Sequence, residues 1–100
     1  MPDPRIFPIE NVTDTFATVG VASTLVLAAN EYRVDTEFVN DSEQIMYLAR
    51  GNAAVIGSGI RLNAGGGSYR IGTSNLFLGD IYGICAGGQA NLAISEGHNP

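Results

Sequence analysis

The sequence predicts an all-β protein, a small antiparallel β-sandwich or barrel-like domain of hairpins with an extended N-terminal arm. Short runs of alternating apolar residues flank three pairs of turn-forming residues: Asp41-Ser42, Gly65-Gly66 and Gly87-Gly88. Two-residue connections of this kind favour turns whose backbone twist matches that of paired strands. All four prolines lie near the ends of the chain, so the apolar runs between the turns are free of them.

Composition limits the chain to one folded unit and excludes several classes of protein. Its 100 residues are 45% hydrophobic and 15% charged, which suits a single core and is too apolar for a disordered chain. No apolar run reaches the roughly 20 residues that span a bilayer, and no basic start precedes an apolar segment, so we expect neither a membrane association nor a signal peptide. The net charge of −5 repels phosphate backbones, so we expect no nucleic-acid partner.

Proline placement divides the chain into an arm, a domain and a tail. Prolines at positions 2, 4 and 8 predict an extended arm over residues 1–15, followed by a β-domain over 16–96 and a tail over 97–100. Three apolar side chains in the arm are candidates for contact with its own domain or with a neighbouring subunit: Ile6, Phe7 and Ile9. Burial of these side chains nearly offsets the cost of ordering the arm, so it should become ordered only against a partner.

A period of two in the apolar residues predicts the strands, and the turn pairs predict how they are joined. Strands are expected near residues 16–19, 22–29, 33–39, 44–50, 53–56, 59–63, 68–72, 80–86 and 90–95. Within these, Thr24–Ala29 is the one stretch that could be helical, and we assign it to a strand. Because a two-residue turn fixes register, each turn pair specifies which residues face the core. The residues so predicted are Phe38, Ile45, Tyr47, Ile60, Leu62, Ile71, Ile81 and Ile94.

The opposite face of the first predicted hairpin is the candidate protein interface. In this register Met46 and Leu48 lie beside Arg33, Asp35 and Arg50. An apolar centre with charged residues around it is the usual composition of a protein interface. We therefore expect the chain to associate with itself or with a larger shell through this face.

The second predicted hairpin places Arg61 directly opposite Arg70. Like charges at opposed positions destabilise a sheet, and no acidic residue is placed to relieve this pair. Either an acidic surface of a partner receives the two arginines, or both point into solvent. The chain has five arginines and no lysine, which fits contacts with protein and fits GC-rich codon use equally well.

No constellation of residues predicts catalysis, a cofactor or a metal ion. Cys85 is the only cysteine and should be a buried apolar side chain, with His98 too close to the C terminus to activate it. The carboxylates near Asp35 and Glu37 lack EF-hand spacing, and a solvated sheet face explains them better than calcium or a glycosidase pair. Tyr82 and Phe77 keep a carbohydrate-binding surface open as an alternative. We expect no enzymatic activity.

Turn and core residues follow a characteristic order over about residues 20–96. They are Ala29-Asn30-x-x-Arg33, Asn40-Asp-Ser42, Tyr47-Leu48, Gly59-Ile60-x-Leu62, Gly65-Gly66-x-Ser68-Tyr69, Gly79-x-Ile81 and Leu92. In this order they resemble small accessory proteins of tailed-bacteriophage virions. The resemblance implies a β-sandwich without enzymatic activity that binds the particle as a head decoration or cement protein, commonly as a trimer.

The resemblance and the residue pattern lead to the same expected function. We expect a structural protein of a phage particle, made in the host cytoplasm and located on the capsid surface of the virion. Its partners would be the major capsid protein or other virion subunits, with the chain itself a homo-oligomer, for which the resemblance implies a trimer. A tail or baseplate component, a small carbohydrate-binding module and a small enzyme are the alternatives.

Overall fold

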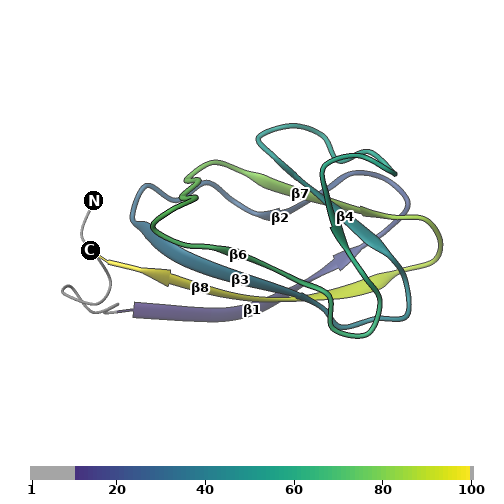
Figure 1. Cartoon of the computed structure of the whole chain (residues 1–100), viewed down its shortest axis with the longest axis horizontal. Coiled ribbons are helices and arrows are strands. Elements are labelled where there is room, and N and C mark those ends of the chain that lie inside the picture. The colour runs from purple at the N-terminus through teal and green to yellow at the C-terminus, as the bar shows by residue number, and fades with distance from the viewer. Residues whose placement is uncertain (1–10, 100) are drawn as a thin grey trace.

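The computed structural model describes residues 11–99, which fold into two four-stranded antiparallel sheets packed face to face (Figure 1). The strands are β1 (Asn11–Val19), β2 (Thr24–Leu27), β3 (Arg33–Asn40), β4 (Met46–Arg50), β5 (Ile60–Leu62), β6 (Ser68–Ile71), β7 (Ile81–Cys85) and β8 (Ala90–His98). The described part of the chain contains no helix, and hence none long and apolar enough to cross a membrane. The predicted all-β sandwich is confirmed.

The strands follow the order of a jelly roll. One sheet has the order β1-β8-β3-β6 and the other has the order β2-β7-β4-β5, so the chain changes sheet at every connection except β4–β5. An eight-stranded double sheet of this kind consists of two Greek keys. Figure 1 shows β6, β3, β8 and β1 as one layer beneath the strands of the second sheet.

The three hairpins predicted from the turn pairs are wrong. Asp41-Ser42 lies between β3 and β4, Gly65-Gly66 between β5 and β6, and Gly87-Gly88 between β7 and β8, and each connection joins different sheets. Residues 11–99 instead contain one hairpin of consecutive strands, β4–β5, with a connection over residues 51–59. Glycines at positive φ, such as Gly65 at 72° and Gly88 at 61°, reverse the chain across a core as readily as within a sheet.

Asn40 shows why the first connection crosses between the sheets. Its side chain is fully buried, and Nδ2 donates to the carbonyl oxygens of Gln44 at 2.6 Å and Leu62 at 3.1 Å. The Asn40 amide oxygen accepts a hydrogen bond from the Ser42 hydroxyl at 2.6 Å. One buried amide thus links the end of β3 to the start of β4 and to β5 in the opposite sheet.

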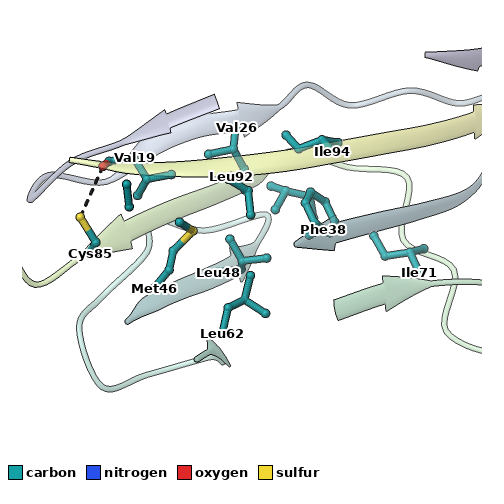
Figure 2. Packing of buried hydrophobic residues seen from close by; sticks show 12 residues of the cluster. Val19, Val26, Phe38, Met46, Leu48, Leu62, Ile71, Cys85, Leu92 and Ile94 are labelled. Atoms are coloured by element: carbon teal, nitrogen blue, oxygen red, sulfur yellow. Dashed lines mark hydrogen bonds between the residues drawn. The ribbon is translucent and has the colours of Figure 1, made fainter. Parts of the chain in front are cut away.

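Because the predicted hairpins do not form, the buried and exposed faces of β4 are the reverse of those predicted. Met46 and Leu48, predicted to point outward, are fully buried, whereas Ile45 and Tyr47, predicted to be buried, are half-buried. Figure 2 shows Met46, Leu48 and Leu62 of one sheet meeting the side chains of the other sheet across the core. The remaining predicted core residues lie in this core or pack against it: Phe38, Ile60, Leu62, Ile71, Ile81 and Ile94.

Strand boundaries differ from prediction at both ends of the described chain. β1 begins at Asn11, so residues 11–15, assigned to the arm, are paired with β8. β8 continues to His98, which takes the first two residues of the predicted tail into the sheet. Thr24–Leu27 is a strand as predicted, whereas residues 53–56 form part of the β4–β5 connection rather than a strand.

Candidate protein-interaction surfaces

Arg33, a predicted interface residue, is an internal structural residue. Its side chain is 0% exposed, and Nε donates to Glu96 Oε2 at 2.6 Å. The two terminal nitrogens donate to the carbonyl oxygens of Phe77 at 2.7 Å, Gly79 at 3.0 Å and Ala28 at 2.8 Å. The planar guanidinium satisfies several acceptors at once, as arginine does in buried sites. Arg33 therefore ties β8 and two loops together at one end of the sandwich.

The structure separates Arg61 and Arg70, which were predicted to lie opposite each other. Arg61 lies on β5 opposite Tyr47, and its Nε donates to Asn63 Oδ1 at 3.0 Å. Arg70 lies on β6 in the other sheet, opposite Glu37, and forms an ion pair with Asp35 at 3.3 Å. The predicted pair of Arg61 with Arg70 is therefore wrong, and Arg70 has acidic neighbours. An exposed pair of this kind contributes about 0–1 kcal/mol to folding.

The predicted interface is thus dispersed. Met46 and Leu48 are in the core, Arg33 is buried, and Asp35 and Arg70 lie on the outer face of the opposite sheet. Arg50 is exposed at the end of β4, next to the connection over residues 51–59. Ile6, Phe7 and Ile9 lie outside the described residues. Arg50 thus adjoins the β4–β5 connection, whereas Asp35 and Arg70 line a shallow surface hollow together with Val12 of β1.

The β4–β5 connection carries one apolar surface on the outer side of its sheet. Ala54 of this connection is buried, and its backbone N–H donates to Ser23 Oγ at 2.8 Å, just before β2. Because β2 and β4 are separated by β7 in the sheet, the connection has to cross the outer face to reach Ser23. The two adjoining segments expose four large apolar side chains, which we name the loop patch: Val21, Leu25, Val55 and Ile56.

A second apolar surface lies along β1. Val12 is 59% exposed and Phe16 is 68% exposed, and both alternate with Asp14 on the outer face of the β1-β8-β3-β6 sheet. The neighbouring positions on β8 carry small side chains, with Ala93 opposite Phe16 and Gly97 opposite Val12. The sequence prediction missed this surface because it began the strand at residue 16. The alternation of Val12, Asp14 and Phe16 is the signal that would have extended it.

The residues considered for small-molecule chemistry are not brought together. Cys85 is buried at the end of β7, where its Sγ lies 3.3 Å from the carbonyl oxygen of Val19 (Figure 2). His98 is at the far end of β8, with Nε2 3.3 Å from the hydroxyl of Thr13. Residues 11–99 contain no group of three histidine, cysteine or acidic side chains that could hold a metal ion. Phe77 packs against the core, so it does not form an exposed platform with Tyr82.

The fold and its surfaces define a small jelly-roll domain with two exposed apolar regions, the loop patch and the outer side of β1. Comparisons with protein-family models, curated proteins and solved structures found no match to the chain.

Proposed function

We propose that the protein is a non-enzymatic structural subunit that binds the outside of a phage capsid as a decoration or cement protein. The order of its turn and core residues, which resembles accessory virion proteins, supports this class. Jelly rolls recur in viral capsid domains, and also in lectins and cupins, so the fold agrees with the proposal without selecting it. A tail or baseplate position is a variant of the same structural role.

The observation that carries the proposal is the loop patch. Apolar residues scattered singly over a surface need no explanation, whereas a group of them marks a site of interaction. Here four large apolar side chains lie on two segments joined by the hydrogen bond between Ala54 and Ser23, and Arg50 is exposed beside the same connection. The buried centre of a protein interface is more apolar than the rest of the surface, and arginine is enriched at interfaces.

The connection that carries the patch is held in place from within. Ala54 is buried against the sheet, and the N–H of Gly51 donates to the carbonyl oxygen of Asp80 at 2.7 Å. Val55 and Ile56 follow directly after the buried Ala54. A surface that is already ordered loses little conformational entropy on binding, which favours a stable contact. We propose that the loop patch contacts the major capsid protein.

The double substitution Val55→Glu with Ile56→Glu tests this assignment. It places two carboxylates in a contact that would exclude water, so binding to particles prepared without the chain should fall at least tenfold. Co-sedimentation of the purified chain with such particles measures the binding. Tyr32→Glu is the matched control, because Tyr32 is an exposed large side chain on a different connection and its substitution should leave binding unchanged.

Two outcomes would contradict the proposal at different levels. If the folded double variant binds particles as the wild type does, the loop patch is not the contact. If mass spectrometry of purified particles finds no stoichiometric copies of the chain, the virion function itself is wrong. Binding on a glycan array, lost on substitution of Tyr82, would then support the carbohydrate-binding alternative.

A further inference from the structure

The free edge of β1 differs from the other edges of the sandwich. β1 and β6 are the edge strands of one sheet, and β2 and β5 are those of the other (Figure 1). β6 and β2 have four residues each and β5 has three, whereas β1 has nine. The pairing of β2 shifts register between Leu25 and Leu27, whereas β1 pairs with β8 without a break. Among residues 11–99, β1 offers the longest regular edge.

β1 lacks the features that normally protect such an edge. Natural sheets discourage edge-to-edge pairing with lysine, proline, bulges or inward-pointing charges. β1 contains no lysine, arginine, proline or glycine, and Asp14 is its one charged residue. The hydroxyl of Ser95 on β8 donates to Asp14 Oδ1 at 2.6 Å, which holds this carboxylate toward β8 and away from the free edge. Within residues 11–99, no strand pairs with this edge, and nothing in its sequence blocks a further strand.

We propose that two copies of the chain associate through this edge, with β1 of one copy antiparallel to β1 of the other. The contact joins the two four-stranded sheets into one continuous sheet in the order β6-β3-β8-β1-β1-β8-β3-β6. A twofold axis relates the copies, so each edge supplies the backbone donors and acceptors that the other requires. The occupant is a second copy because β1 can pair antiparallel with itself without placing two like charges directly opposite each other.

The same condition on like charges also selects the register. A twofold axis at Thr15 pairs residues 12–18 of the two strands, with Val12 opposite Thr18 and Asp14 opposite Phe16 of the second copy. Val19 is fully buried and is not part of this pairing. No carboxylate then faces a carboxylate directly, whereas an axis at Asp14 would oppose the two Asp14 side chains. Phe16 lies diagonal to Phe16 of the second copy, a spacing that aromatic side chains reach. The pairing thus covers part of the apolar surface exposed at Val12 and Phe16.

A single cysteine at Thr15 tests both the contact and its register. Residues that meet at the twofold axis have Cα atoms about 4.5–5.5 Å apart, which a disulfide can bridge. The two copies of Thr13 would instead lie four positions apart, about 14 Å along the strands, too far for a disulfide. Both residues are exposed and point to the same side of β1, so Thr13→Cys is a matched control. Under mild oxidation, Thr15→Cys should give at least tenfold more cross-linked dimer than Thr13→Cys.

The wild-type chain is the baseline for cross-linking, because its one cysteine, Cys85, is buried and should not form a disulfide. Sedimentation of the full-length chain should show a concentration-dependent dimer. Thr15→Lys should weaken this dimer at least tenfold, since it sets two ammonium groups directly opposite each other. Circular dichroism of the variant should stay that of the wild type, which separates loss of association from loss of the fold.

Each remaining outcome overturns part of the inference. If the wild-type chain stays monomeric at millimolar concentration, the β1–β1 contact is wrong. This holds whatever covers the edge of β1 instead, be it residues 1–10 or a strand of another protein. Efficient cross-linking of Thr13→Cys in place of Thr15→Cys overturns the register. The contact does not rest on the proposed virion function, and substitutions in the loop patch should leave the dimer intact. Failure of one proposal is therefore distinguishable from failure of the other.

Discussion

At the scale of single residues, Arg33 has the most consequential environment. Arg33→Met removes the cation that pairs with Glu96 and leaves three backbone carbonyl oxygens without their donor. Breaking a buried ion pair by removing one partner leaves an uncompensated charge, which costs about 3–5 kcal/mol. We expect a loss of that size in the free energy of unfolding, measured by urea denaturation. The prediction fails if the variant is as stable as the wild type.

Two further variants separate the ion pair from general effects of losing an arginine. Arg61→Met removes an exposed arginine and should change stability by no more than about 0.5 kcal/mol. Arg33→Met combined with Glu96→Leu should recover part of the loss, because no buried carboxylate is then left unpaired. The carbonyl oxygens of Phe77, Gly79 and Ala28 would still lack their donor, so recovery should be incomplete.

The errors of sequence prediction at this scale have a simple physical origin. Residues 45–48 are all apolar, Ile45, Met46, Tyr47 and Leu48, so alternation alone cannot decide which pair faces the core. The prediction assumed a two-residue turn at Asp41-Ser42 within one sheet, which placed Ile45 and Tyr47 in the core. This placement is wrong because Asp41-Ser42 joins two sheets. The same assumed register placed Arg33 on the outer face. Its partner Glu96 lies 63 residues away in sequence, and nothing local indicates the contact.

At the scale of elements, the β4–β5 hairpin allows a test with neighbouring glycines. Gly59 has φ of +84°, and a Cβ placed there would lie 2.5 Å from the carbonyl oxygen of Leu48. Gly57 has φ of +82° but open space around it. Positive φ costs a non-glycine residue about 1–2 kcal/mol, and crowding adds about 1–3 kcal/mol. Gly59→Ala should therefore destabilise by about 2–5 kcal/mol, against about 1–2 kcal/mol for Gly57→Ala.

Thermal or urea unfolding of the two variants checks this ranking. Equal losses at the two positions would mean that Gly59 does not approach β4 as closely as the structure has it. Because β5 pairs only with β4, a weakened hairpin should also loosen the connection that presents the loop patch. Particle binding by Gly59→Ala should accordingly fall more than binding by Gly57→Ala.

Which elements form was predictable from sequence, whereas how they pair was not. The seven strands predicted at 16–19, 22–29, 33–39, 44–50, 59–63, 68–72 and 80–86 overlap β1 to β7, and 90–95 overlaps β8, because strand formation follows a local period of two. Pairing in a jelly roll joins strands far apart in the chain, such as β1 with β8. Two glycines in a row show that the chain turns, but not whether it returns within one sheet or crosses to the other.

At the scale of the whole molecule, the two candidate contacts lie on different sheets. The loop patch covers the β2-β7-β4-β5 sheet, while the open edge belongs to the β1-β8-β3-β6 sheet. The proposed capsid contact and the proposed dimer contact can therefore form on one chain at the same time. The proposed edge contact has twofold symmetry, whereas the resemblance implies a trimer. Sedimentation distinguishes the two assemblies, and a trimer stays a separate prediction.

Two deletions, of residues 1–10 and of residues 1–15, test where the arm ends and the sandwich begins. Deleting residues 1–10 leaves every pair of β1 with β8 intact, from Asn11–His98 to Val19–Ala90. We therefore expect this variant to fold with an unchanged circular dichroism spectrum and a similar melting temperature. Its attachment to particles should be weaker, because the arm carries Ile6, Phe7 and Ile9.

Deleting residues 1–15 should behave differently, although the sequence alone places all fifteen in the arm. It removes the first five residues of β1, including Asp14, whose carboxylate accepts the Ser95 hydroxyl. It also exposes one side of β8 from Ile94 to His98, since β1 covers that edge. The melting temperature should drop by several degrees, in line with a loss of about 1–3 kcal/mol in a chain of this size. Equal melting temperatures for the two deletions would show that residues 11–15 contribute nothing to the sheet.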